Sequence, residues 1–283
     1  MAVARQMQGR VSIVAADAMQ VYRRMDIGTA KPTAKDRAEV EHFCLDLAEP
    51  HERFTVAAFQ EAKLIALAQI VERNKRALVV GGTGLYVTAV VDGLSMPGEW
   101  PKIRAELEAV DDVGLLVAEL QLRDPLALEK IEPNNKRRLV RALEVCRGSG
   151  REFSSFGSGI AGFQASSVRQ IGIRWKRDVL AQRISQRVAS MIENGLVAEV
   201  KNLLNEPKPL SATARQALGY QEIIDHIEGK LSLDEACQQI ALRTRQFSVR
   251  QERWYRRDPR IEWVDVSADP VGQITPLVMA ALT

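Results

Sequence analysis

Two short apolar runs constrain the fold of this chain more than any other feature, because each one leads into polar or glycine-rich sequence. The run Val11–Ala15 is rich in β-branched residues, which is typical of a buried strand, and Asp17 follows just beyond it. Arg76–Val80 has the same character and leads into Gly-Gly-Thr-Gly at residues 81–84. A helical pattern over residues 55–75 separates the two runs. Strand and helix in alternation predict a parallel α/β sheet.

The middle of the chain has a different pattern. Residues 100–151 read as helical throughout, with no strand pattern, and a glycine- and serine-rich stretch over residues 148–162 follows. Further strands are predicted at residues 44–47, 168–175 and 261–266, and further helices at residues 178–204, 220–228 and 232–257. We therefore expect an α/β core made of residues 1–95 and 165–283, interrupted by a helical insertion of residues 96–164.

Composition excludes several classes of protein. Hydrophobic residues make up 46% and charged residues 27% of the 283 positions, as in an ordinary globular domain. No apolar run is long enough for a bilayer, and the N-terminus lacks the apolar segment of a secretory signal, so we expect a cytoplasmic protein without membrane contact. Three cysteines without a CxxC pair, and three histidines, argue against zinc and disulfide sites.

Basic residues are concentrated in two segments, although the net charge is only +3. Residues 133–151 hold six basic side chains against Glu144, and residues 243–260 hold seven arginines against Glu252 and Asp258. Such clusters indicate an anionic partner, plausibly nucleic acid. Two solvated helix faces are the alternative interpretation.

Asp17 and the Gly-Gly-Thr-Gly segment are predicted to lie at the same edge of the sheet. The carboxyl ends of parallel strands are where α/β folds bind ligands, so both segments could face one crevice. Glycines let backbone amides approach a ligand, and a helix N-terminus favours negative charge. Alternatively, Asp17 is a helix N-cap and residues 81–84 form a plain turn.

Three basic side chains are candidates for holding phosphate groups. Arg183 and Arg187 are four residues apart and so share one face of a helix, where two guanidinium groups suit a diphosphate. Lys31 lies in a loop between a small turn and Pro32. Surface solubility is the alternative for the arginine pair.

Several separate motifs, in order along the chain, resemble the tRNA dimethylallyltransferase family, also called tRNA isopentenyltransferases. The resemblance extends from about Val11 to Trp263. The motifs are DAMQVY, MDIGTAKP, EHFCLDL…FTVAAF, GGTGLY, KRRLVRALEV, QRISQRV…NGLVAEV, ALGYQE and TRQFSVRQ…W.

This resemblance implies a P-loop NTPase-like parallel sheet whose helical insertion grips the anticodon stem-loop of tRNA, in a protein expected to be a monomer. It implies transfer of a dimethylallyl group from dimethylallyl diphosphate to N6 of the adenosine 3′-adjacent to the anticodon, with Mg²⁺ as cofactor. Asp17 would be the general base, which suits a weakly nucleophilic amine. The residues that would contact tRNA are Ala18, Met19, Gln20, Thr83, Arg104, Arg137, Arg138, Leu139, Val140 and Arg141.

One family motif is not found. A phosphate loop of the type GxxxxGK[ST] would precede the Asp17 strand by one helix, and Met1–Met7 resembles the end of that helix. We therefore expect an N-terminally truncated core with weakened diphosphate binding. The alternatives are a catalytically impaired RNA-binding fragment and a dimethylallyltransferase of free adenine nucleotides, which would not need a basic insertion. A nucleotide kinase is disfavoured, because it also needs the loop.

Overall fold

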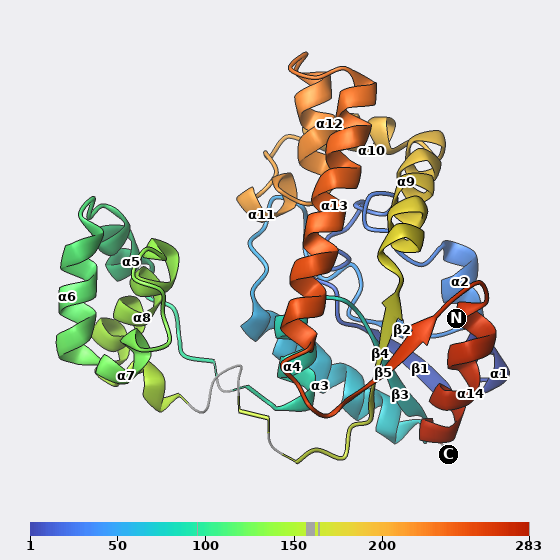
Figure 1. Cartoon of the computed structure of the whole chain (residues 1–283), viewed down its shortest axis with the longest axis horizontal. Helices are drawn as coiled ribbons and strands as arrows, with labels where there is room; N and C mark the ends of the chain where they lie inside the picture. Colours follow the sequence, from blue (N-terminus) through green and yellow to red (C-terminus); the bar gives the residue numbers. More distant parts are fainter. Residues whose placement is uncertain (95, 157–161, 164, 283) are drawn as a thin grey trace. The chain divides into compact units, whose positions relative to one another are not determined.

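The computed structural model describes residues 1–282 except residues 95, 157–161 and 164. The chain divides into two compact units (Figure 1). Unit 1 is made of Met1–Val91 and Ala165–Thr283, and unit 2 is Asp92–Gln164. Part of the predicted glycine- and serine-rich stretch falls outside the described residues.

The first segment of unit 1 forms a three-stranded parallel sheet in the order β2-β1-β3. Its elements are α1 (Ala2–Gln6), β1 (Val11–Ala15), α2 (Ala34–Glu39), β2 (His42–Phe43), α3 (Val56–Glu72), β3 (Arg76–Val80) and α4 (Gly84–Val91). The register pairs Val11 with Arg76 and Ala15 with Val80, so β1 and β3 end side by side. The prediction of a parallel α/β arrangement is confirmed.

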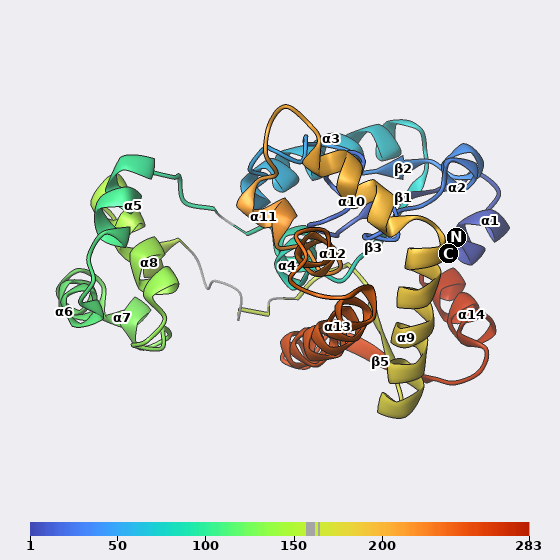
Figure 2. The same ribbon diagram turned by 90° about the horizontal axis from the view of Figure 1, so that it is seen from above.

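All five residues of β1 are buried, which explains its apolar sequence. Val14 belongs to the large core of unit 1. Val11 and Ile13 face a smaller core that α1 shares with α14 (Pro270–Leu282). Figures 1 and 2 show both chain ends beside these two helices. Both faces of β1 are therefore covered, as is usual in parallel sheets.

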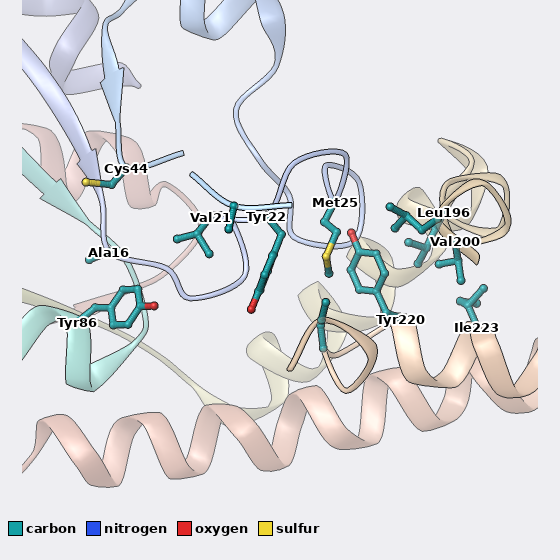
Figure 3. Packing of buried hydrophobic residues seen from close by; sticks show 14 of the residues in the cluster. Ala16, Val21, Tyr22, Met25, Cys44, Tyr86, Leu196, Val200, Tyr220 and Ile223 are labelled. Atoms are coloured by element: carbon teal, nitrogen blue, oxygen red, sulfur yellow. The ribbon is translucent and has the colours of Figure 1, made fainter. Parts of the chain in front are cut away.

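The second segment of unit 1 adds a two-stranded parallel sheet and a group of packed helices. Its other elements are β4 (Gln170–Trp175), α9 (Arg177–Glu193), α10 (Leu196–Leu204), α11 (Ala212–Arg215), α12 (Tyr220–Ile227), α13 (Leu233–Tyr255) and β5 (Ile261–Val266). The large core joins residues of both segments, including Tyr22, Tyr86, Leu196 and Tyr220 (Figure 3). Among the described helices, none is both long and apolar enough to cross a membrane.

Two predicted elements were wrong in detail. The helix predicted at residues 178–204 is interrupted, because Gly195 has a φ of +98° and precedes α10 in a left-handed conformation. Residues 44–47 do not form a strand, because Cys44 and Asp46 have φ angles of +62° and +54°. The strand instead consists of His42 and Phe43, which pair with Ile13 and Val14.

All regular secondary structure among the described residues of unit 2 is helical. It contains α5 (Pro101–Glu108), α6 (Val113–Arg123), α7 (Pro125–Leu128), α8 (Lys136–Ser149) and a 3₁₀ turn at Phe153–Ser155. Leucines from three of these helices form its own core, among them Leu107, Leu120 and Leu143. A unit with its own buried core is compact without contributions from the rest of the chain.

Candidate active site around Asp17

The carboxylate of Asp17 lies in a turn directly beyond β1. Its Oδ1 accepts hydrogen bonds from the amides of Met19 (2.8 Å) and Gln20 (3.3 Å). No helix follows, so Asp17 is not a helix N-cap. Among the described residues, no donor contacts the second oxygen, Oδ2. The turn therefore fixes one carboxylate oxygen and leaves the other to accept a proton or hydrogen bond from a ligand.

The loop after β3 is joined to the Asp17 turn by backbone and side-chain hydrogen bonds. The amide of Ala16 donates to Val80 O (2.8 Å), and the amide of Thr83 donates to Ala16 O (3.3 Å). The amide of Ala18 donates to the Thr83 hydroxyl oxygen at 2.9 Å. A Cβ atom at Gly81 would lie 2.2 Å from Ala16 O, so only glycine allows this close approach. The Thr83 hydroxyl still has its own proton to donate.

The end of α13 packs on the same glycine-rich loop. The Gln251 side-chain amide donates to Gly82 O at 2.8 Å. The indole of Trp254 fills the space beside Gly84, where a Cβ atom would lie 2.3 Å from Trp254 Nε1. From the sequence, this helix is predicted to carry a basic segment. The structure gives its last turns a second role as a wall of the site.

Two tyrosines that are not among the predicted site residues, Tyr86 and Tyr255, lie near Asp17, and a third, Tyr22, lies near Tyr86. Burial, followed by the charge of Asp17, raises the pKa of Tyr255 on α13. Burial, followed by the charges of Tyr22 and Asp17, raises the pKa of Tyr86 on α4. Within the described part of the chain, the buried hydroxyls of Tyr22 and Tyr255 have no hydrogen-bond partner. Such unpaired polar groups are costly, and they are found where a ligand or water completes the contact.

Lys31 is buried, in contrast to what its predicted role requires. Its ammonium lies 2.6 Å from Asp26 and 2.8 Å from Asp46, and it donates to Tyr22 O at 2.6 Å. The side chain is 0% exposed. Two carboxylates therefore balance its charge inside unit 1, and the diphosphate contact predicted for Lys31 finds no support.

Arg183 and Arg187 lie on α9 with both side chains exposed. The Arg183 guanidinium stacks over the Trp175 ring at 4.2 Å, which restricts its orientation. Neither arginine forms an ion pair with any of the described residues. Both guanidinium groups are therefore available to an anionic ligand, and α9 packs against α13, the helix that forms a wall of the site.

A family comparison decides how this arrangement is to be interpreted. The profile of the IPP transferase family matches residues 20–258. The chain belongs to the IPP transferase family.

Relatives of the chain include the tRNA dimethylallyltransferase of Carboxydothermus hydrogenoformans, with 41% identity over 98% of this chain and 90% of that protein. The tRNA dimethylallyltransferase of Geobacter metallireducens is 44% identical over 89% of this chain and 84% of its own length. The family is one of transferases, so the prediction of an enzyme is confirmed.

Solved structures agree with the α/β fold of the chain. The full-length tRNA isopentenylpyrophosphate transferase of Bacillus halodurans superposes with a TM-score of 0.68 and 35% identity, covering 99% of this chain and 90% of the other. A eukaryotic dimethylallyltransferase acting on tRNA gives a TM-score of 0.80 at 22% identity, covering 99% and 73%. At that identity the second likeness supports the fold alone.

The basic residues predicted to contact tRNA in unit 2 differ in whether their charged groups are already paired with a carboxylate. Arg104 and Arg141 both pair with Glu144, at 2.6 and 2.9 Å, and the Glu144 side chain is 0% exposed. Burial raises the pKa of Glu144, but hydrogen bonds from the Trp100 amide and the two arginines outweigh it and hold that pKa below its ordinary value. Arg104 and Arg141 therefore stabilise unit 2.

The remaining residues of that basic run divide into two pairs. Leu139 and Val140 are 0% and 3% exposed in the core of unit 2. Their buried side chains offer no surface to a ligand in this structure, so the tRNA contacts predicted for them find no support here. Arg137 and Arg138 are exposed, and the described residues offer them no ion-pair partner. They are the members of the run that remain free for a phosphate backbone.

The family resemblance implies Mg²⁺, which would need a set of oxygen or nitrogen ligands. Among the described residues, no three His, Cys, Asp or Glu side chains gather to hold a metal ion. One oxygen of Asp17 is already occupied by two amides. These residues do not fit a metal held by protein ligands alone, and no step below depends on a metal ion.

Proposed function

We propose that this chain transfers a dimethylallyl group from dimethylallyl diphosphate to N6 of the adenosine 3′-adjacent to the anticodon of tRNA. The observation that carries the proposal is the carboxylate of Asp17, which the turn holds by Oδ1 while Oδ2 has no donor among the described residues. Membership of a family whose relatives are named tRNA dimethylallyltransferases supports this assignment.

The proposed chemistry is a substitution at the allylic carbon. The N6 amine forms a bond to that carbon, the bond from carbon to the diphosphate oxygen breaks, and the diphosphate leaves with the electron pair. Asp17 Oδ2 takes the proton that the amine loses, which makes a weak nucleophile effective. Arg183 and Arg187 are our candidates for stabilising the charge on the departing diphosphate.

The proposal includes a role for unit 2 in tRNA binding and a core type for unit 1. Unit 2 is proposed to grip the anticodon stem-loop through its exposed arginines, Arg137 and Arg138. Unit 1 is proposed to have a P-loop NTPase-like core. The phosphate loop expected before residue 1 stays a prediction, and reading the in-frame codons upstream of Met1 checks it.

The test is incorporation of labelled dimethylallyl from its diphosphate into unmodified tRNA, with AMP as a competing acceptor. We expect label in tRNA, at the adenosine next to the anticodon, and much slower labelling with Asp17→Asn. Label in AMP alone would favour the adenine-nucleotide alternative. Binding of tRNA without transfer would favour the RNA-binding alternative, and either result would contradict the proposal.

A further inference from the structure

A carboxylate outside the Asp17 turn, that of Glu199 on α10, holds a loop of unit 1 through backbone amides. Its oxygens accept hydrogen bonds from three consecutive residues, Asp26 (3.0 Å), Ile27 (2.8 Å) and Gly28 (3.2 Å). The Tyr220 hydroxyl donates a fourth bond at 2.6 Å. Among the described residues, no cationic side chain pairs with Glu199. Oriented amides therefore balance its charge, as in an anion-binding nest.

Tyr220 is fitted closely to the same loop. Its ring is 0% exposed, and a Cβ atom at Gly28 would lie 2.4 Å from Tyr220 Cε2. Figure 3 shows the Tyr220 hydroxyl directed toward the loop that carries Met25. Burial and the charge of Glu199 raise the pKa of Tyr220, so its hydroxyl keeps the proton that it donates.

The segment from Arg24 to Ala30, which contains the 26–30 loop, needs such support, because its backbone is strained at both ends. Arg24 and Ala30 have φ angles of +61° and +49°, which non-glycine residues rarely adopt. Such conformations persist only where the surroundings hold them. Inside the loop, the Thr29 hydroxyl donates to Met25 O at 2.6 Å. Three bonds attach this small hydrogen-bonded loop to Glu199 on α10, and the fourth joins Glu199 to Tyr220 on α12.

The held loop sets the orientation of the Gln20 side chain. Gln20 Nε2 donates to Thr29 O at 3.1 Å and to Ala30 O at 3.4 Å. Two carbonyl oxygens can only be met by the NH₂ end of the amide, so the amide cannot be flipped. Oε1 then has no donor among the described residues. Since the backbone amide of Gln20 bonds to Asp17 Oδ1, this free acceptor belongs to the turn that carries the free Oδ2.

We infer that Glu199 and Tyr220 are positioning residues for the transfer reaction, acting through the 26–30 loop on Gln20. The inference rests on the proposed function. An exocyclic amine has two N–H groups, so one can donate to Gln20 Oε1 while the other gives its proton to Asp17 Oδ2. A base with a carbonyl oxygen at that position would place two acceptors against each other. Glu199 and Tyr220, which we call the clamp, therefore favour a base that carries an amino group at this position, because they hold Gln20 Oε1 as an acceptor.

The experiment is a double-mutant cycle on transfer to unmodified tRNA. Glu199→Gln replaces one acceptor oxygen with an NH₂ group facing the amides, and we expect kcat to fall about tenfold with an unchanged KM for dimethylallyl diphosphate. Gln20→Ala should also lower kcat. Because the two residues act in series, the double variant should be no slower than Gln20→Ala alone.

Glu206→Gln is the matched control. Glu206 pairs with Arg24 at 2.7 Å, in the same segment, but it contacts none of the three amides. We expect this variant to keep nearly the parent rate. Tyr220→Phe removes one donor and keeps the carboxylate, so it completes the same cycle if Glu199→Gln does not fold.

The outcomes separate this inference from the proposed function. Losses that multiply in the double variant, or a loss in Glu206→Gln equal to that in Glu199→Gln, would overturn the inference while leaving the function intact. An absence of transfer by the parent chain would overturn both. A double variant that matches Gln20→Ala, with an active control, supports the inference.

Discussion

The amide of Ala18 donates a hydrogen bond to the hydroxyl of Thr83, 65 positions later in the chain, at 2.9 Å. The bond connects the turn after β1 to the loop after β3, and so it fixes the Asp17 carboxylate relative to the start of α4. Thr83→Val keeps the shape of the side chain but leaves this amide without its acceptor. We expect kcat to fall about tenfold, since an unpaired amide costs about 1–3 kcal/mol. Thr83→Ser should restore the rate, and a Ser variant as slow as Val would contradict this role.

Asp17→Asn should abolish most turnover without loss of tRNA affinity. The amide can still accept bonds from the turn through its oxygen, but it cannot take a proton from the amine. Removal of a general base typically costs about 10²–10⁴-fold in rate. Single-turnover transfer and filter binding of tRNA measure the two effects separately. Equal losses of binding and rate would make Asp17 a structural residue.

Arg183→Ala and Arg187→Ala should each raise the KM for dimethylallyl diphosphate about tenfold or more, because charge-assisted bonds to phosphate oxygens contribute about 1.5–3 kcal/mol. Arg177→Ala is the matched control, since Arg177 is exposed on the same helix. Initial rates at varied diphosphate concentration give the three constants. A similar increase for the control would indicate a general charge effect.

Lys31→Met should destabilise the fold rather than change substrate affinity. The variant leaves Asp46 and Asp26 without their buried cation, and since both carboxylates reach water in part, we expect a loss of about 3 kcal/mol. Burial raises the pKa of Asp46, but Lys31 and Arg37 outweigh it and lower that pKa. The resulting stability is present above the unfolded pKa and is lost as pH falls through the folded pKa. Urea unfolding should therefore show a difference at pH 7 that narrows below about pH 4.

Arg137→Ala and Arg138→Ala should weaken tRNA binding in a salt-dependent way. Each phosphate contact removed lowers the slope of log K against log salt by about one. Arg104→Ala is a contrasting variant, because it leaves the buried carboxylate of Glu144 short of a partner. That change should lower the melting temperature of unit 2. Unchanged salt slopes for the first two variants would place the tRNA contact elsewhere.

Strands β1 and β3 and the two loops that follow them were predictable, because the sequence patterns that indicate them are local. The apolar run Val11–Ala15 needs only its own residues to indicate a buried strand, and the glycine-rich residues 81–84 directly after a second apolar run indicate a loop. In both cases the sequence near the residue determines the conformation. The placement of Asp17 beyond β1 follows directly from the end of that run.

The clamp and the burial of Lys31 were not predictable, because they depend on which distant segments meet. Glu199 is separated from Ile27 by 172 positions, and Gln251 from Gly82 by 169. Helical periodicity indicates which face of a helix is apolar, but it does not identify the loop on the other side of a contact. The local sequence at Lys31 and Pro32 does not indicate whether the lysine is surrounded by carboxylates or by solvent.

The division of unit 1 into two segments also has a consequence for synthesis on the ribosome. The large core joins Phe59 and Tyr86 to Ile184, Tyr220 and Ile240, so the first segment cannot bury its apolar surface until the second has emerged. Unit 2 lies between them in sequence and has its own core, so it can fold while the first segment waits. A translation product that stops after unit 2 would thus carry a folded helical part and an exposed, aggregation-prone one.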